Sequence, residues 1–233
     1  MNRKSSLFVA ALIIIAPATF ADGLGHYGGQ NTIRIHGGNF EPDGKSAYWQ
    51  DKEVDFFAEA EDFDDFQFGV DWVHYVSARI GIIGTISGYE GSSLQSYREF
   101  VTADGRDIFH QTTLDLTNVE LGVIFHLLSG DAVVLPYIGG GVGIYELSLS
   151  EDGDFVDFGF TPPALFNDLF LEEGEAFGTF FLVGVEVPIG SSWSVFGEAK
   201  WSDADDELTG DFAGLGPLDL SGQALSAGVS FSF

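Results

Sequence analysis

The last ten residues, Ala224–Phe233, read A-L-S-A-G-V-S-F-S-F. Side chains alternate across a strand with a period of two, so this segment has one apolar face, which includes Phe231 and Phe233, and one face of small or polar residues. Such a strand could pack on the core of a soluble sandwich, or it could face lipid on one side and the lumen of a barrel on the other. The alternation alone does not separate these two folds.

The N-terminus has the three parts of a secretory signal peptide. Two basic residues are followed by a short apolar run, Leu7–Ala16, and by a small-residue cleavage site at Thr19–Ala21, with cleavage after Ala18 as an alternative. The apolar run is shorter than the roughly 20 residues that a spanning helix needs. We therefore assign residues 1–21 to a signal peptide and residues 22–233 to one exported domain, which can enter a membrane only as strands.

The composition excludes several classes of site and partner. The chain has no cysteine, which excludes disulfides, thiolate zinc sites and a cysteine nucleophile. An exported domain without disulfides must be held together in another way, and a closed sheet would suffice. The net charge is −27, from 36 acidic and 9 basic residues, and removal of Arg3 and Lys4 with the leader makes it −29. Nucleic acid is therefore a poor partner.

Alternating apolar and polar residues between turn signals predict eight strands. In chain order they span Asn31–Phe40, Phe66–Tyr75, Arg79–Tyr89, Thr113–Phe125, Val134–Leu147, Glu175–Val187, Trp193–Ser202 and Ala224–Phe233. In the fourth strand Leu114 and Leu116 fall on the face opposite to its other apolar residues. This change of face predicts a bulge near Thr117.

The predicted connections alternate between a few residues and long segments. The four long ones contain 29 of the 36 acidic residues and span Glu41–Asp65, Glu90–His110, Glu146–Glu175 and Asp203–Asp219. Short periplasmic turns and long outer loops are typical of outer-membrane barrels, whereas a soluble sandwich has no reason to sort its loops by length. We therefore predict an all-β fold, an eight-stranded antiparallel up-and-down transmembrane β-barrel with an acidic outer face.

Three segments carry a resemblance to a known family. They are L-P-Y-I-G-G-G-V-G-I-Y (Leu135–Tyr145), G-V-E-V-P-I-G-S-S-W-S-V-F-G-E-A-K-W (Gly184–Trp201) and the terminal V-S-F-S-F. They resemble the small outer-membrane β-barrel domains of the OmpA-like and opacity-protein type. The resemblance implies a bacterial outer-membrane protein whose barrel is an anchor and whose loops carry recognition. It also makes the terminal strand, with Phe231 and Phe233, look like a signal for barrel assembly.

The same resemblance sets the expected partners. They are outer-membrane lipid, lipopolysaccharide and the barrel-assembly machinery, and we expect a monomer. Because the chain ends at the barrel, we expect no periplasmic peptidoglycan-binding domain of the kind that some relatives carry.

Eight ionisable residues fall on the inward faces of the predicted strands. Charges at membrane depth are costly unless they are paired, and an eight-stranded barrel is just wide enough for side chains to fill it. We predict that these residues plug the lumen as a mutually neutralising network, with a catalytic or proton-conducting role as the alternative. They are Arg34, His36, Asp71, Arg79, Glu120, Glu186, Glu198 and Lys200.

Two further patterns suggest chemistry but have plainer explanations. Gly139–Gly143 resembles a nucleotide loop, but Ile144 stands where a third glycine is required and no helix pattern follows, so we predict a glycine-rich strand and no cofactor. A barrel enzyme that modifies lipid A would need a nucleophile and a base near the outer rim. The available residues are His110, His126 and Ser129, which match no such motif, and we expect no enzyme.

The third long connection favours another alternative, a narrow channel for small hydrophobic molecules. It contains a cluster of apolar residues that could equally fold onto the barrel rim: Phe155, Phe158, Phe160, Leu165, Phe166, Leu169 and Phe170.

The acidic residues of the connections form three dense clusters. Carboxylate oxygens at this density suit calcium or magnesium, but the spacing does not match the twelve-residue calcium loop. We therefore expect weak binding of divalent cations without a defined metal site. The clusters are Glu59, Glu61, Asp62, Asp64 and Asp65; Glu151, Asp152, Asp154 and Asp157; and Asp203, Asp205, Asp206 and Glu207.

Overall fold

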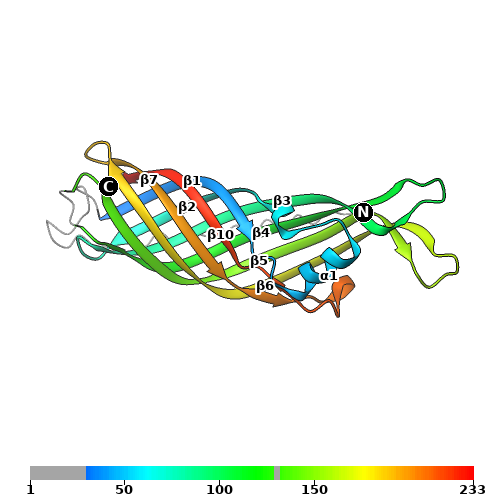
Figure 1. Ribbon diagram of the computed structural model, residues 1–233. Helices are drawn as coiled ribbons and strands as arrows, with labels where there is room; N and C mark the ends of the chain where they lie inside the picture. Colours follow the sequence, from blue (N-terminus) through cyan, green and yellow to red (C-terminus); the bar gives the residue numbers. More distant parts are fainter. Residues whose placement is uncertain (1–29, 129–131) are drawn as a thin grey trace, which may run out of the picture.

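The computed structural model describes residues 30–128 and 132–233, in which eight strands form one closed antiparallel ring (Figure 1). The predicted signal peptide lies outside the described residues. The ring strands are β1 (Asn31–Pro42), β2 (Asp65–Tyr75), β3 (Ile80–Val101), β4 (Asp107–His126), β5 (Leu135–Asp157), β6 (Ala164–Pro188), β7 (Trp193–Asp203) and β10 (Gly222–Ser232). Around the barrel their order is β1–β10–β7–β6–β5–β4–β3–β2. This up-and-down topology confirms the predicted fold class.

The first and last ring strands, β1 and β10, close the barrel. Their antiparallel pairing places Thr32 opposite Ser232. At the end of this seam the Asn31 N–H donates to the Phe233 carbonyl at 3.1 Å, and the Phe233 N–H donates to the Asn31 carbonyl at 2.9 Å. Closure gives the backbone groups of both terminal strands hydrogen-bond partners. A strand in a bilayer needs such partners within the protein, because the lipid offers none.

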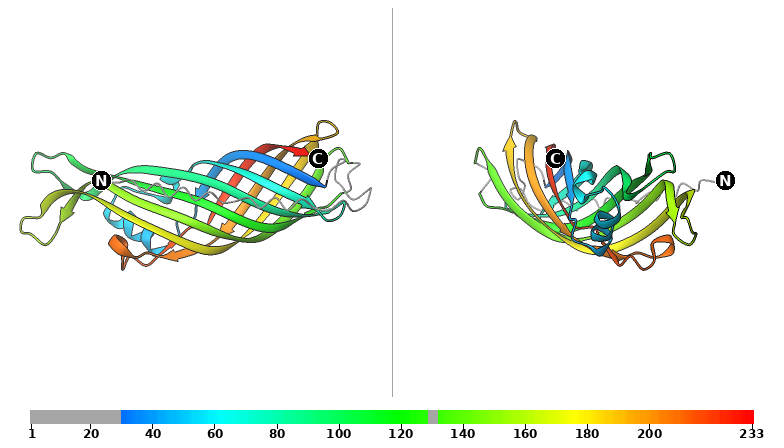
Figure 2. Two further views of the ribbon diagram at one scale, coloured as in Figure 1. Left: turned by 180° about the vertical axis from the view of Figure 1, so that it is seen from behind. Right: turned by 45° about the vertical axis from the view of Figure 1, so that its right-hand side comes forward.

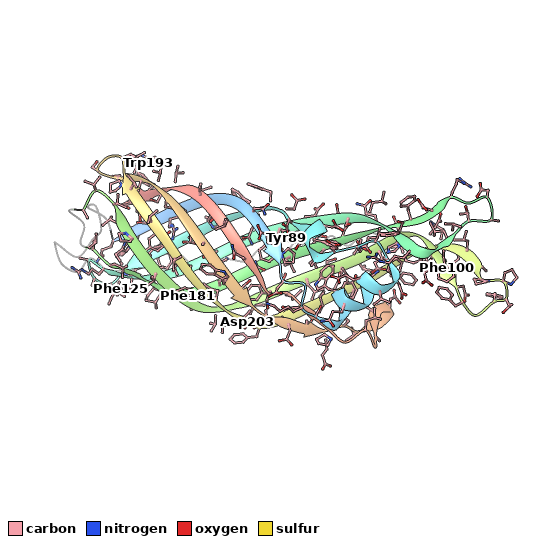
Figure 3. All side chains as sticks on the ribbon, in the orientation of Figure 1. Tyr89, Phe100, Phe125, Phe181, Trp193 and Asp203 are labelled. Carbon is pink, nitrogen blue, oxygen red and sulfur yellow. The ribbon has the colours of Figure 1, made fainter. Side chains whose placement is uncertain are left out.

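Exposed and buried side chains alternate along the ring strands, and the exposed ones project outward around the barrel (Figure 3). In β2, Phe66, Phe68 and Val70 are exposed, whereas Gln67 and Asp71 are buried. The apolar outer face and the polar inner face are those that the period-two pattern predicts for a strand between lipid and a lumen.

Strands β3 to β6 continue beyond the ends of their neighbours and project from the barrel as a four-stranded extension (Figure 2). Only residues 102–106 and 158–163 remain as connections at its tips. The loops predicted at Glu90–His110 and Glu146–Glu175 are therefore wrong over most of their length. The alternation continues through them, because Leu149, for example, is fully buried on the inward face of β5.

The inward face of the extension is covered by the other two long connections, which together form a cap. The first contains α1 (Ala47–Asp55) and η1 (Ala60–Phe63), and the second contains β8 (Asp205–Glu207), η2 (Gly210–Phe212) and β9 (Pro217–Asp219). Figure 1 shows α1 beside the extension, close to the segment that follows β7. Among the described residues no helix is long and apolar enough to cross a bilayer.

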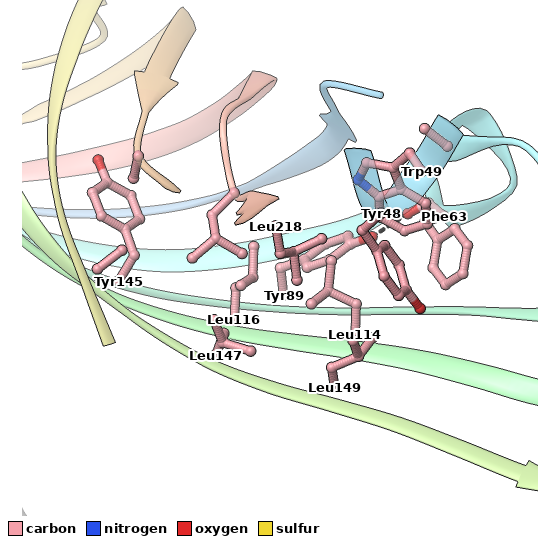
Figure 4. Close-up of a cluster of buried hydrophobic side chains, with 14 of the residues drawn as sticks. Tyr48, Trp49, Phe63, Tyr89, Leu114, Leu116, Tyr145, Leu147, Leu149 and Leu218 are labelled. Atoms are coloured by element: carbon pink, nitrogen blue, oxygen red, sulfur yellow. Dashed lines mark hydrogen bonds between the residues drawn. The ribbon is translucent and has the colours of Figure 1, made fainter. Parts of the chain in front are cut away.

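The cap and the extension share a hydrophobic core (Figure 4). Trp49 and Phe63 of the cap lie with their ring centroids 4.9 Å apart, and both are almost fully buried. Leu114 of β4 and Leu149 of β5 belong to the same cluster. The interior is therefore apolar at this end of the barrel, where the sequence analysis predicted acidic loops.

This core explains the change of face in β4. Leu114 and Leu116 point inward because the cap offers them apolar partners, and the pairing of β3 with β4 stays regular past Thr117. The bulge predicted near Thr117 is wrong. The register between these strands shifts instead between Ser96 and Val101, near the tip.

Candidate functional site in the barrel interior

Arg34 of β1 lies at the centre of the inward-facing charges. Its Nη2 is 2.9 Å from Glu198 Oε2 on β7, and its Nε is 3.5 Å from Asp71 Oδ2 on β2. The guanidinium also donates a hydrogen bond to the Tyr137 hydroxyl at 2.7 Å and lies 3.8 Å from the centroid of the Phe196 ring. One cation thus joins carboxylates from strands on either side of β1.

Both of these carboxylates have further partners. The Thr85 hydroxyl donates to Asp71 Oδ1 at 2.8 Å, and His36 Nε2 lies 3.3 Å from the same oxygen. The Tyr137 hydroxyl donates to Glu198 at 2.9 Å. Buried polar networks rigidify a structure when their members are satisfied, and they are costly when one partner is missing. Both carboxylates of this network accept hydrogen bonds, whereas the buried Arg34 Nε has only the ion pair with Asp71 at 3.5 Å.

Two further inward-facing acids have separate partners. Lys200 Nζ lies 2.8 Å from Glu120 Oε2, and the Tyr145 hydroxyl donates to Glu120 Oε1 at 3.0 Å. The Ser230 hydroxyl donates to Glu186 Oε1 at 3.0 Å. The lumen therefore holds four carboxylates with two permanently charged partners, Arg34 and Lys200, so neither cation is redundant.

Seven of the eight residues predicted for the lumen lie there with buried side chains: Arg34, His36, Asp71, Glu120, Glu186, Glu198 and Lys200. Arg79 does not, and this is a correction. It is exposed in the turn before β3, where the Ser77 hydroxyl accepts hydrogen bonds from the Arg79 and Ile80 N–H groups, so the strand begins one residue later than predicted.

Sequence reasoning did not include Tyr137 and Tyr145 in the network. Both hydroxyls bind inward-facing carboxylates. The sequence could have indicated this, because in β5 both tyrosines alternate with outward-facing residues such as Ile138 and Ile144, which are exposed.

A second buried polar group lies between the cap and the extension, beyond the membrane-spanning part of the barrel. Lys52 of α1 forms an ion pair with Glu151 of β5, and the Tyr48 hydroxyl donates to Glu151 at 2.8 Å. Burial lowers the pKa of Lys52, and the nearby Glu151 carboxylate opposes that shift. Glu151 belongs to an acidic cluster for which we predicted weak cation binding, and here it anchors α1 to the sheet.

His110 of β4 lies beside this ion pair and is 1% exposed. Its ring is edge-on to Phe56 at a centroid distance of 4.7 Å and stacks on Phe155 at 5.0 Å. Burial lowers the pKa of His110 to about 4, with a smaller contribution from Lys52, and Glu151 opposes the shift. The imidazole is therefore neutral in the folded protein at physiological pH.

We expect acid to loosen the cap through His110. The unfolded chain binds a proton near pH 6.5 and the folded chain only near pH 4, so stability that neutral His110 contributes is lost as pH falls through this window. His110→Phe keeps an aromatic ring and removes the titration. Urea midpoints and limited proteolysis of the cap at pH 7 and 4.5 should show a smaller acid loss in the variant, and equal losses would contradict the expectation.

Two solved structures cover almost the whole chain. Neisserial surface protein A superposes with a TM-score of 0.54 at 11% identity, covering 91% of this chain and 100% of that one. OprG from Pseudomonas aeruginosa superposes with a TM-score of 0.54 at 13% identity, covering 88% of this chain and 97% of that one. This chain has the fold of the small outer-membrane β-barrels. No family model and no curated protein matches the sequence, so the likeness rests on the fold alone.

The apolar cluster predicted in the third long connection divides between two environments. Phe155 is buried, and Phe170 packs against the core of the cap, where a cavity of about 250 Å³ lies beside both rings. The other five residues are exposed on the extension: Phe158, Phe160, Leu165, Phe166 and Leu169.

The histidines considered for catalysis are both enclosed by the barrel. His110 lies under the cap, and His126 is fully buried near the short turns, where the Tyr75 hydroxyl is 3.1 Å from its Nε2. Ser129 lies outside the described residues. Gly139–Gly143 lies within β5 and pairs with both neighbouring strands, as a glycine-rich strand should.

The two residues of the predicted assembly signal lie on the lipid face of the last strand. Phe231 and Phe233 are exposed, with ring centroids 6.1 Å apart, and Phe231 also lies 4.9 Å from the Trp193 ring.

The acidic clusters do not converge on a metal site. Within residues 30–128 and 132–233 there is no group of three or more His, Asp or Glu side chains that could hold a metal ion. In η1, Glu59 and Asp62 instead cap each other's backbone in a capping box. Weak cation binding stays a prediction about a diffuse anionic surface, and calcium titration against sodium at equal ionic strength tests it.

Proposed function

We propose that this chain is an outer-membrane barrel that holds an acidic recognition surface outside the cell and passes no solute. The observation that carries the proposal is the occupancy of the barrel interior. Near the short turns lies an apolar cluster that includes Val73, Ile83, Ile124 and Leu182. The Arg34 network follows, and the core of the cap lies beyond it.

The extension of β3 to β6 supports the recognition part of the proposal. A membrane anchor needs strands only long enough to cross the bilayer, about 9–11 residues each. β5 and β6 have 23 and 25 residues. The surplus length raises an ordered sheet, with its acids and exposed apolar residues, well clear of the lipid.

Conductance measured across a planar lipid bilayer distinguishes a closed membrane anchor from a pore. The purified barrel is expected to give no stable conductance steps, because charged and apolar side chains fill its lumen. Stable steps in the wild-type protein would overturn the proposal.

A shortened barrel tests the recognition part. Leu147 and Gly174 are already cross-strand partners, so residues 148–173 can be replaced by a two-residue turn. Nanodiscs of zwitterionic lipid that carry the wild-type barrel should bind immobilised polylysine, and the shortened barrel should bind it several-fold less. The shortened barrel must still migrate differently on a gel before and after boiling. Equal binding by the two barrels would contradict a recognition role for the extension.

A channel for small hydrophobic molecules is the second candidate. The cavity beside Phe155 and Phe170 favours it, because aromatic rings suit an apolar ligand, but Lys52, Asp55, Glu151 and Asp211 also line this cavity. The route inward from that cavity leads to the buried core of the cap and then to the charged network. Vesicles that carry the barrel should therefore take up an apolar dye no faster than empty vesicles.

We propose no catalytic role. What supports this is the burial of His110 and His126, the two histidines that the sequence offered for catalysis. Lipid A isolated with and without the protein should have the same mass spectrum, and a mass difference would restore the enzyme hypothesis.

A further inference from the structure

The outer half of β6 is an open edge of the extension. β6 pairs with β5 along its whole length, from Ala164 opposite Asp157, but its pairing with β7 extends outward only to Thr179. The β6 backbone beyond Thr179 therefore has a strand partner on one side only. Unpaired edges of this kind are templates for another strand.

Part of this edge, and part of the opposite edge, is covered by the chain itself. On β3 the Phe57 N–H donates to the Ser96 carbonyl at 2.8 Å, and Phe56 forms a bridge with Tyr97. On β6 the Glu172 carboxylate accepts a hydrogen bond from the Thr209 N–H at 3.0 Å. Residues 164–171 of β6 have no strand partner on this side within the described parts of the chain, and the Leu169 N–H donates to the Asp168 carboxylate at 2.9 Å.

This segment reads A-L-F-N-D-L-F-L, with three leucines on its outward face and Phe166, Asp168 and Phe170 on its inward face. Leu165, Leu169 and Leu171 point outward and are 48%, 56% and 48% exposed. Asp168 lies exposed on the inward face. The segment contains no lysine, proline or bulge, and Asp168 is its one inward-pointing charge of the kind that can protect an edge.

We infer that residues 164–171 of β6 receive an extended basic peptide segment by strand addition. The added strand would place apolar side chains beside the outward leucines and a lysine or arginine beside Asp168. Charge complementarity identifies this occupant, because the chain carries a net charge of −27 and a second copy would bring the same charge. The inference rests on the proposed function, since the edge must lie outside the membrane.

Binding of a labelled peptide of alternating lysine and valine, measured by fluorescence anisotropy, tests the inference. The barrel is held in zwitterionic nanodiscs so that the bilayer does not attract the peptide. A second peptide has the same sequence with N-methyl groups on alternate residues, which keep the charge and remove backbone donors. We expect the N-methylated peptide to bind about tenfold more weakly, because strand addition depends on main-chain hydrogen bonds.

Leu169→Lys places a positive charge on the open edge and should weaken binding about tenfold. Leu94→Lys is the matched control: Leu94 is also an outward leucine, 66% exposed, but it lies on β3, on the opposite side of the extension, and its change should alter binding less than about twofold. Asp168→Asn should weaken binding and reduce its salt dependence. Hydrogen exchange should slow within residues 164–171 when the peptide binds to the wild-type barrel.

Three results would overturn the inference. Equal binding of both peptides would show attraction by charge alone, and equal loss in Leu169→Lys and Leu94→Lys would place the peptide elsewhere. Self-association of the wild-type barrel that Leu169→Lys abolishes would make a second copy the occupant. These results are distinguishable from a failure of the proposed function. Conductance steps would refute the closed anchor without affecting peptide binding. Equal binding of the two peptides to a non-conducting barrel would refute only this inference.

Discussion

Arg34→Met is expected to destabilise the folded barrel by about 3–5 kcal/mol, the usual cost of removing one partner from a buried ion pair. Arg34 contacts both Asp71 and Glu198, and within the described residues Lys200 is the only other permanent cation in the same lumen. Methionine fills a similar volume, so the loss reports charge rather than a cavity. The two carboxylates would remain buried with the Thr85 and Tyr137 hydroxyls and the His36 imidazole as their partners.

Urea unfolding of the barrel in lipid vesicles, followed by tryptophan fluorescence, measures this effect. Arg79→Met is the matched control, because Arg79 is exposed in a turn and its loss should change stability by less than about 0.5 kcal/mol. Adding Glu198→Gln to Arg34→Met should recover part of the loss, since it removes one of the orphaned charges. Equal stability of the two arginine variants would refute the network as a structural element.

Gly38→Val is expected to prevent closure of the barrel. Gly38 lies in β1 on the seam with β10, and a Cβ atom built at this position would clash with the carbonyl oxygen of Leu225 and with Ser226 Cα. Both are backbone atoms of the partner strand, which cannot move aside as a flexible side chain can. A valine must therefore push β10 away and break the hydrogen bonds of the seam.

Electrophoresis before and after boiling measures the folded fraction of this variant. Gly88→Val in β3 is the control, because a Cβ at Gly88 has no atom within 4 Å and the position is exposed. We expect Gly88→Val to show the folded band and Gly38→Val to lose it almost completely. A folded band of normal intensity in Gly38→Val would mean that the seam is wider than the structure indicates.

The sequence by itself determined the number of ring strands, the parity of their faces and the identity of most lumen charges. The physical reason is that each strand has lipid on one side and the lumen on the other. Apolar and polar residues therefore alternate with a period of two along the sequence. Arg34, Asp71 and Glu198 could therefore be placed inside without any knowledge of their partners. The prediction for Arg79 was wrong because this residue lies at a strand end, where hydrogen bonds to the Ser77 hydroxyl decide where the strand begins.

Only the tertiary structure decided what those inward residues meet. Arg34 and Tyr137 are 103 positions apart in the chain, as are Tyr48 and Glu151, and no local pattern relates such pairs. The inward leucines of β4 looked misplaced because parity shows which way a side chain points but not whether water, charge or a cap lies there. The extension of β3 to β6 and its buried core follow from that cap, which covers an apolar face that a loop in water would have left exposed.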